Sequence, residues 1–288
     1  MSSPRLLVVE GNTAEGRKWH ADAGGRVASD NYADVLRRVC PGARVDVCYP
    51  ADLGANLPDR GGIDGYDGVA LTGSSLHIYD LGPSIMRQVE LARAVFETET
   101  PFFGSCWGLQ VATVAAGGTV RKNPKGREIG FARGIMLTDA GEEHDLFWDK
   151  PPVFDAITVH LDEIEETARG TTILATNAVS AVQAAEIKTR RGMFWGVQYH
   201  PEYSFGDLAV ITRRVKAMAI EQGLFKGDID HASYVRELEA LESNPKDAAL
   251  TWRHGISSAV YDFGARTQEL KNWIERYVVP TRSRRGRG

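Results

Sequence analysis

The chain has 288 residues, and its 34 basic and 38 acidic side chains give a formal net charge of −4. With 43% hydrophobic and 25% charged residues, it has the composition of a globular protein, which excludes a disordered chain, a collagen and a coiled-coil rod. The length fits one large domain or two small ones, and the mildly acidic balance argues against binding to nucleic acid, which needs a basic surface.

The first part of the chain alternates between predicted strands and predicted helices. Short apolar runs that end in turn residues predict strands, and apolar residues at helical spacing predict helices. The strands lie at 5–9, 43–49, 67–72 and 101–104, and the helices at 31–39, 83–97 and 107–116. Residues 12–30 are polar and glycine-rich, and we expect an irregular loop there, either a lid or a disordered segment. Strands that alternate with helices predict a mostly parallel central sheet flanked by helices, which is an α/β fold.

The middle of the chain predicts more sheet, partly antiparallel, because short β-prone pieces follow one another without helices. These pieces lie at 119–122, 129–137, 153–160, 171–175, 181–187 and 193–199. A helix is predicted at 207–222, and beyond Gly223 the pattern is helical as far as about Tyr277. We therefore expect a main domain at 1–223 and a helical extension at 224–288 that ends in a disordered basic tail.

The sequence also predicts where the protein resides. The apolar run near the amino terminus stops at Glu10, too early for a signal sequence, and no stretch reaches the roughly 18 apolar residues of a membrane span. The chain has three cysteines, too few for a disulfide framework, so a reducing compartment is the simpler expectation. These features predict a soluble cytoplasmic protein without membrane binding.

One cysteine lies where a predicted strand passes into a predicted helix, in the segment GSCWG at 104–108. A nucleophile between two glycines at such a junction is typical of a nucleophile elbow, a sharp turn that lifts the side chain above the sheet edge. The N–H groups at the start of the following helix stabilise a thiolate there. The alternative is a buried structural cysteine. The pattern favours Cys106 as a nucleophile.

A cysteine nucleophile needs a group that returns a proton to the leaving group. His200 follows a predicted strand at the carboxyl edge of the sheet, where the sites of α/β proteins form. Glu202 lies on the same side of an extended chain and can accept a hydrogen bond from His200, and Pro201 favours that extended conformation. We therefore predict an orienting carboxylate at Glu202 and an acid–base at His200. No His or Cys cluster has the spacing of metal ligands, so no metal is expected.

The two segments together, GSCWGLQ at 104–110 and GVQYHPE at 196–202, resemble the class I glutamine amidotransferase family of the Cys-His-Glu type. The resemblance runs from about residue 5 to about residue 223. It includes LTGS at 71–74, which is similar to the family's glycine turn. GREIG at 126–130, with Asp-Leu-Phe further on, is similar to the branch related to the amidotransferase domain of guanosine monophosphate synthetase. The fold implied is a flavodoxin-like core.

The resemblance also implies the chemistry and the site residues. It implies that Cys106 attacks a glutamyl γ-amide, forms a γ-glutamyl thioester and releases glutamate with an amine or ammonia. The oxyanion would be held by backbone N–H groups of Gly73 and Trp107. Gln110 is implied to contact the bound glutamyl group. Thr158, Val159 and His160 are implied to offer backbone groups to its α-carboxylate and ammonium. No cofactor is implied.

Several roles remain open. A hydrolase of γ-glutamyl-amines made by a separate ligase is the first, because no phosphate-binding glycine loop with lysine accompanies the three residues. The alternative is a glutaminase subunit that supplies ammonia to a separate synthetase partner. A non-enzymatic binding module fits less well because the three residues are intact. A cysteine-type α/β-hydrolase fits less well because the acid follows the histidine in the chain.

The predicted extension has its own open question. Four aromatic residues give it enough apolar surface to dock on the main domain or to form a homodimer interface. They are Trp252, Tyr261, Phe263 and Trp273. The sequence favours packing over ligand binding for this segment.

Overall fold

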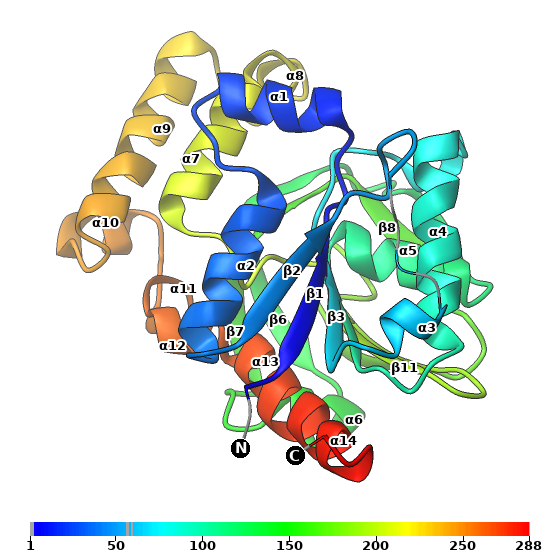
Figure 1. Ribbon diagram of the computed structural model, residues 1–288. Coiled ribbons are helices and arrows are strands. Elements are labelled where there is room, and N and C mark those ends of the chain that lie inside the picture. Colours follow the sequence, from blue (N-terminus) through cyan, green and yellow to red (C-terminus); the bar gives the residue numbers. More distant parts are fainter. Residues whose placement is uncertain (1–2, 56–57, 59, 288) are drawn as a thin grey trace.

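The structure is a computed structural model that describes residues 3–55, 58 and 60–287. In this part of the chain, a nine-stranded sheet is covered by helices on both faces, which confirms the α/β class (Figure 1). Its order is β2-β1-β3-β4-β11-β10-β9-β6-β7. The parallel half consists of β1 (Arg5–Val9), β2 (Arg44–Cys48), β3 (Gly68–Leu71), β4 (Phe102–Ser105) and β11 (Met193–Val197).

The other half of the sheet is antiparallel, as the short β-prone pieces predict. It consists of β6 (Glu128–Leu137), β7 (Val153–His160), β9 (Thr171–Thr176) and β10 (Ala184–Lys188). A separate pair joins β5 (Thr119–Lys122) to β8 (Asp162–Glu166). The sequence does not predict β8, because its five residues, DEIEE, are acidic apart from Ile164 and lack the usual β-prone side chains.

The predicted helices of the first part are present, with small shifts at their ends. Pro83 opens its helix after Gly82, as expected of a residue that lacks an N–H, and the apolar face of that helix is buried. These helices are α2 (Ala28–Val39), α4 (Pro83–Phe96) and α5 (Trp107–Ala115). Short turns of helix lie at α3 (Arg60–Ile63), η1 (Ile78–Asp80), α6 (Asp139–Glu142) and η2 (Asp145–Phe147).

The expectation of an irregular loop at 12–30 is wrong. Residues Ala14–Asp22 form helix α1, whose first turn is capped by the Thr13 hydroxyl accepting a hydrogen bond from the Gly16 N–H at 3.2 Å. None of the residues of α1 is buried. The helix therefore lacks the apolar stripe on which periodicity depends, which is why the sequence does not reveal it.

The hydrophobic core lies on both faces of the sheet. Alternate side chains of β1 point to opposite faces, so that Leu6 and Val8 join one cluster, and Leu7 and Val9 the other. The first cluster lies under α2 and the second under α4 and α5. Two layers of helices thus hold the parallel strands in place and fix the positions of the turns that follow them.

The predicted helix at 207–222 is two helices, and more helices follow. They are α7 (Phe205–Arg214), α8 (Lys216–Glu221), α9 (Asp228–Ser243), α10 (Ala248–Arg253), α11 (Ser258–Tyr261), α12 (Phe263–Arg266), α13 (Gln268–Asn272), the π-helix η3 (Trp273–Val278) and α14 (Val279–Arg284). Of the helices in the described residues, none is both long and apolar enough to cross a membrane.

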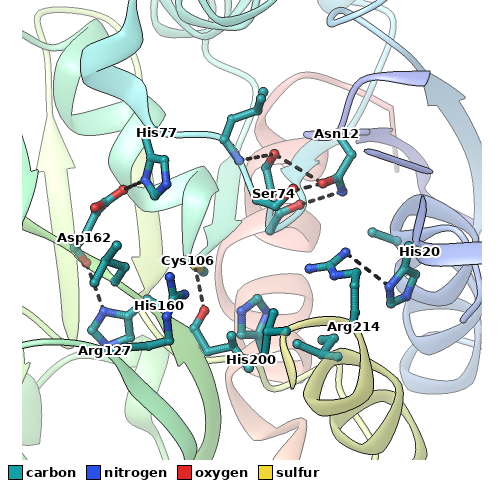
Figure 2. A pocket seen from close by; sticks show the side chains of 18 of the residues that line it. Asn12, His20, Ser74, His77, Cys106, Arg127, His160, Asp162, His200 and Arg214 are labelled. Carbon is teal, nitrogen blue, oxygen red and sulfur yellow. Dashed lines mark hydrogen bonds and ion pairs between the residues drawn. The ribbon is translucent and has the colours of Figure 1, made fainter. Parts of the chain in front are cut away.

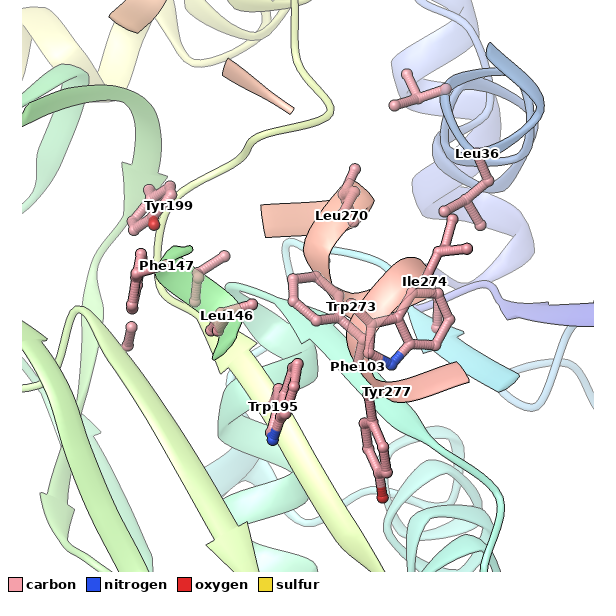
Figure 3. Close-up of a cluster of buried hydrophobic side chains, with 14 of the residues drawn as sticks. Leu36, Phe103, Leu146, Phe147, Trp195, Tyr199, Leu270, Trp273, Ile274 and Tyr277 are labelled. Atoms are coloured by element: carbon pink, nitrogen blue, oxygen red, sulfur yellow. The ribbon is translucent and has the colours of Figure 1, made fainter. Parts of the chain in front are cut away.

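The last helices pack into the main core. Trp273 and Ile274 are buried beside Leu36 of α2, and Tyr277 stacks at a tilt on Trp195 of β11, 4.9 Å between ring centroids (Figure 3). Trp252 behaves differently and is 86% exposed. Of the four aromatic residues named in the predicted extension, Trp273 therefore packs on the main core and Trp252 does not. The division of the chain at residue 223 stays a prediction.

The expectation of a disordered basic tail is wrong for the residues described. Arg282 is buried and pairs with Asp67 at 3.3 Å, and Arg285 donates a hydrogen bond to the Asp64 carbonyl oxygen at 2.7 Å. A run of arginines is usually solvated. Here α14 and the residue after it lie beside the segment that precedes β3, where the Tyr66 carbonyl oxygen accepts a hydrogen bond from Arg285 and the Asp67 carboxylate forms an ion pair with Arg282.

Candidate active site

Cys106 occupies the turn between β4 and α5, and its backbone is strained. Its φ of 52° and ψ of −101° lie in a region that residues other than glycine rarely adopt. Close contacts require the two flanking glycines. A Cβ on Gly104 would lie 2.8 Å from the backbone of Gly108, and a Cβ on Gly108 would lie 2.6 Å from the Leu71 carbonyl oxygen. The turn has the sharp geometry that the sequence predicts.

The Cys106 side chain lines a pocket of about 260 Å³ at the carboxyl edge of the parallel strands. Sγ lies 3.6 Å from the Val159 carbonyl oxygen, and 5% of the residue is exposed. Segments that follow β1, β3 and β7 form one side of the pocket, and α1, α7 and α8 form the other (Figure 2). Sites of α/β proteins form at this edge, because turns from neighbouring parallel strands meet there.

His200 lies beside Cys106 and is held from three directions. Its Nδ1 is 2.7 Å from the Glu202 Oε1, its ring stacks on Tyr203 with 3.9 Å between centroids, and its backbone N–H donates to Ile157. A Cβ on Gly73 would lie only 2.6 Å from the His200 Cε1. These contacts hold the imidazole in one position. Glu202 binds Nδ1, and Nε2 stays available to the Cys106 sulfur and a substrate.

The electrostatics of this group favour an imidazolium. Burial lowers the pKa of His200, but the charge of Glu202 and the interaction with the Cys106 sulfur outweigh it and raise the pKa to about 10. His200 is therefore protonated at neutral pH. A protonated ring next to a sulfur stabilises the thiolate form.

The residues implied by the resemblance do not all reach the pocket. Gly73, Gln110, Val159 and His160 line it. Both ring nitrogens of His160 are engaged, with Nδ1 2.9 Å from the Asp162 carbonyl oxygen and Nε2 2.8 Å from a Glu128 oxygen. These contacts give His160 a structural role and leave it no free nitrogen for acid–base chemistry.

Two of the implied residues have side chains that do not line the pocket, and the roles implied for them, which use their backbones, stay predictions. Thr158 is fully buried, and its side chain does not line the pocket. The Trp107 side chain is also fully buried, and its Nε1 donates to the Gln88 Oε1 at 2.7 Å. Only the backbone of Trp107, in the first turn of α5, is near Cys106, so its indole belongs to the core.

Among the residues that the structure describes, one carboxylate lines the pocket, that of Asp162 at the start of β8. Its two oxygens are 2.6 Å from the His77 Nδ1 and 3.1 Å from the Tyr79 hydroxyl. The hydrogen bond and the charge of Asp162 raise the pKa of His77 despite partial burial. The sequence reasoning missed this acid, although it lies only two residues beyond His160.

Two guanidinium groups face the pocket, and neither has a carboxylate partner within the described residues. An N–H of Arg127 is 3.2 Å from the Met218 sulfur, and the Arg214 Nη1 is 3.3 Å from the His20 Nδ1. The Nε of each arginine is buried without a hydrogen-bond partner. Burial lowers the pKa of both guanidinium groups. In Figure 2, Arg127 lies on the side of His160 and Asp162, and Arg214 lies beside His20.

Helix α1 completes the pocket wall with Trp19 and His20. Sequence reasoning missed these two residues, because α1 has no apolar stripe that would reveal the helix. The Arg214 guanidinium lies over the Trp19 ring at 4.8 Å. Burial and the neighbouring arginine lower the pKa of His20 to about 4, so His20 is neutral at neutral pH. No group of three or more His, Cys, Asp or Glu in the described ranges is placed to hold a metal ion.

Comparison with known proteins gives relatives that span most of the chain. A γ-glutamyl-L-1-hydroxyisopropylamide hydrolase from Pseudomonas sp. is 34% identical over 99% of this chain and 97% of its own length. A γ-glutamyl peptidase from Arabidopsis thaliana is 27% identical over 60% of this chain and 69% of its own. The GMP synthase of Thermosipho africanus is 35% identical over 58% of this chain and 31% of its own.

The fold and the family model agree with these relatives. A glutamine amidotransferase from Thermotoga maritima superposes with a TM-score of 0.65 at 18% identity, over 96% of this chain and 99% of that one, which shows a shared fold. The family model described as glutamine amidotransferase class-I matches residues 33–213, which include Cys106, His200 and Glu202. The chain therefore belongs to the class-I glutamine amidotransferase family.

Proposed function

We propose that the protein is an enzyme that hydrolyses γ-glutamyl amide bonds and releases glutamate with an amine. One observation carries this proposal. At the wall of the pocket, the His200 imidazole lies between the Cys106 sulfur and the Glu202 carboxylate and interacts with both. The name of the full-length Pseudomonas relative supports a γ-glutamyl amide as the substrate class. The three residues would act as nucleophile, acid–base and orienting carboxylate.

In the first half of the proposed reaction, the Cys106 thiolate attacks the γ-carbonyl carbon and a C–S bond forms. The carbonyl electron pair moves to oxygen, where the backbone N–H groups of Gly73 and Trp107 would hold it, each worth about 3–4 kcal/mol to the transition state. The C–N bond then breaks as His200 gives its Nε2 proton to the departing nitrogen. The product is a γ-glutamyl thioester on Cys106.

In the second half, His200 is neutral and can take a proton from water. The hydroxide formed attacks the thioester carbon, the C–S bond breaks and the electron pair returns to sulfur. Glutamate leaves, and His200 and Cys106 regain the charges they started with. The Glu202 carboxylate, 2.7 Å from Nδ1, orients the ring and stabilises its positive charge in both halves.

The charges of the pocket indicate how the glutamyl group would lie. Its α-ammonium group needs an anion, and Asp162 is the acidic residue among the described residues that line the pocket. Its α-carboxylate needs a cation, and Arg127 is attracted electrostatically by both Asp162 and Cys106. Gln110, with Nε2 3.4 Å from the Asp162 carbonyl oxygen, lies at the same end. We therefore place the glutamyl group between Cys106 and Asp162.

The test is covalent capture of the nucleophile. A glutamine-like diazoketone should label the protein once, and peptide mapping should find the label on Cys106. Cys106→Ser should abolish labelling and lower kcat for glutamate release at least about 10³-fold. The control is Cys40→Ser, which removes a half-buried thiol outside the pocket and should leave both readouts unchanged. An unlabelled wild-type Cys106, or a fully active Cys106→Ser variant, would reject the proposal.

A glutaminase that supplies ammonia to a separate synthetase is the second candidate. The matches to GMP synthases, one of which extends well beyond the length of this chain, favour it. It predicts that glutamine is cleaved faster than any γ-glutamyl-amine, and that an ATP-dependent partner raises the rate. Comparing kcat/KM for glutamine and a panel of γ-glutamyl-amines separates the two candidates.

A further inference from the structure

The carboxylate that we assign to the α-ammonium group of the substrate already has two partners. The His77 Nδ1 lies 2.6 Å from the Asp162 Oδ2, and Figure 2 shows the His77 ring pointing toward this carboxylate. The Tyr79 hydroxyl donates a hydrogen bond to Oδ1 at 3.1 Å. The Asp162 side chain is only 4% exposed. An arriving ammonium group therefore meets a buried carboxylate that other residues already hold.

The charge of Asp162 is balanced by His77. A carboxylate removed from water is costly unless a cation pairs with it, and His77 is the basic side chain that contacts Asp162 among the described residues. The hydrogen bond to Asp162, together with the charges of Asp162 and Asp80, raises the pKa of His77 against partial burial and the positive charge of Arg127. These are the charged groups that act on the ring, and the Tyr79 ring stacks on it with 5.4 Å between centroids. In the substrate-free pocket, an imidazolium at His77 therefore pairs with Asp162 at mildly acidic pH.

A substrate ammonium group at Asp162 would bring a second positive charge to the same carboxylate. Two like charges at one site destabilise each other. The imidazolium is the stronger acid of the two, and the His77 side chain is 36% exposed, so that its Nε2 proton can pass to water. The Nδ1–H would still donate to Asp162 after this loss. Substrate binding therefore exchanges one cation for another at a single carboxylate.

We propose that His77 is a positioning residue that couples binding of the glutamyl α-ammonium group to release of one proton. Before binding, the His77 imidazolium neutralises Asp162; after binding, the ammonium group does so, and the Nε2 proton has passed to water. This rests on the proposed function and adds to it how the pocket recognises the glutamyl group. KM is therefore high where His77 is protonated, and it falls as the pH rises through the pKa of His77 in the free enzyme.

The test uses pairs of compounds that differ in one group. The probes are γ-L-glutamylisopropylamide and L-glutamine, and their counterparts without the α-ammonium group are glutarylisopropylamide and glutaramate. For the probe that is cleaved faster, we expect KM of the wild type to be at least about 5-fold higher at about pH 5.5 than at about pH 8. The inhibition constant of its counterpart should change by less than about 2-fold over the same range.

This pH range separates His77 from the other histidines of the pocket. The pKa of His200 is raised to about 10 and that of His20 is lowered to about 4, so neither changes charge near neutral pH. Both ring nitrogens of His160 are engaged by Asp162 and Glu128. A pH dependence of KM that requires the α-ammonium group therefore reports on His77.

The variant is His77→Asn, which keeps an N–H donor for Asp162 but cannot carry a charge. Its KM should not vary with pH, and at about pH 5.5 it should lie at least about 5-fold below that of the wild type. A merely structural role for His77 would raise KM instead. The control is His254→Gln, since His254 also pairs with a carboxylate, 2.7 Å from Glu237, but does not line this pocket. Its KM should follow the wild-type profile.

The outcomes separate this inference from the proposed function. A wild type that cleaves a probe with the same KM at both pH values overturns the inference and leaves the proposed function standing. The same holds if the counterpart shows an equal pH dependence, or if His77→Asn keeps the wild-type profile. The comparison of probe and counterpart needs no variant, so it decides even where His77→Asn fails to fold. A wild type that cleaves neither probe overturns both.

Discussion

At Gly73 there is no room for a side chain between the turn after β3 and the His200 ring. A Cβ there would lie 2.6 Å from the Cε1 of His200, whose ring cannot move aside because Glu202 and Tyr203 hold it. We expect Gly73→Ala to lower kcat about 10²-fold or more, because a displaced acid–base no longer reaches the reacting atoms. Gly82→Ala is the control, since nothing lies within 4 Å of its Cβ position. Steady-state hydrolysis measures both, and equal kcat values would contradict the prediction.

The charge of Glu202 should set the upper pH limit of the proposed reaction. Because the pKa of His200 is raised to about 10, the imidazolium and the stability that it gains from Glu202 are present through neutral pH and are lost as the pH rises through that value. Glu202→Gln removes the charge, so the pKa of His200 should fall by more than one unit. The alkaline limb of kcat/KM should move to lower pH by the same amount, with a loss of about 10²-fold or more in the maximum. A limb that stays in place would show that Glu202 does not control this proton.

At this scale, the sequence predicts the residues whose place is set by a local motif. The elbow at Cys106 and the His-Pro-Glu segment at His200 each define their own geometry within a few residues. Arg214 and Asp162 lie in no such motif, and the GREIG segment that contains Arg127 does not by itself place the Arg127 side chain. Their side chains reach the pocket only because distant elements meet there, and that depends on contacts between residues far apart in the chain.

Helices and strands were predictable where a face is buried. The helix at Pro83–Phe96 has a regular apolar face, and the strands of the parallel half are short apolar runs, so periodicity finds them. Helix α1 has no buried residue, and β8 is acidic, so neither has a pattern to detect. Helix α1, which the sequence does not predict, completes the pocket wall. The sequence therefore predicts the nucleophile better than it predicts the residues that line the pocket.

The cap of α1 should decide how well this helix is ordered. Thr13→Ala removes the hydroxyl that accepts from Gly16, which costs about 1 kcal/mol. Since no residue of α1 is fully buried, we expect amide hydrogen exchange of residues 14–22 to become about 5-fold faster, with a higher KM for γ-glutamyl substrates. Thr138→Ala, which removes the equivalent cap of α6, is the control and should leave α1 exchange unchanged. Unchanged exchange in Thr13→Ala would show that other contacts hold the helix.

Over the whole molecule, the last helices and the active-site strand share one buried network. Glu269 of α13 lies 2.5 Å from the Lys150 Nζ and 2.5 Å from the hydroxyl of Tyr199, the residue before His200. Lys150 and Glu269 are almost fully buried. The C-terminal helices are thereby coupled to the segment that carries the acid–base. The sequence could not reveal this, because it joins three segments far apart in the chain.

This network should give a clear stability signal. Lys150→Met leaves Glu269 buried without its cation, so we expect the free energy of unfolding to fall by about 3–5 kcal/mol. The double variant Lys150→Met/Glu269→Leu removes both charges and should lose less than Lys150→Met alone. Lys18→Met breaks an exposed pair with Asp22 and should change stability by about 0.5 kcal/mol or less. Urea unfolding measures all three, and a double variant at least as unstable as Lys150→Met would contradict the coupling.

Helix α1 touches the substrate pocket yet contributes nothing to the interior of the protein. Replacement of its side chains therefore leaves core packing intact, whereas the same changes in α5 or β4 would unfold the chain. The wall of the pocket that α1 forms is in this way separated from the part that keeps the polypeptide folded. A library randomised at Trp19 and its neighbours is therefore the natural starting point for changing which γ-glutamyl substrates the pocket accepts.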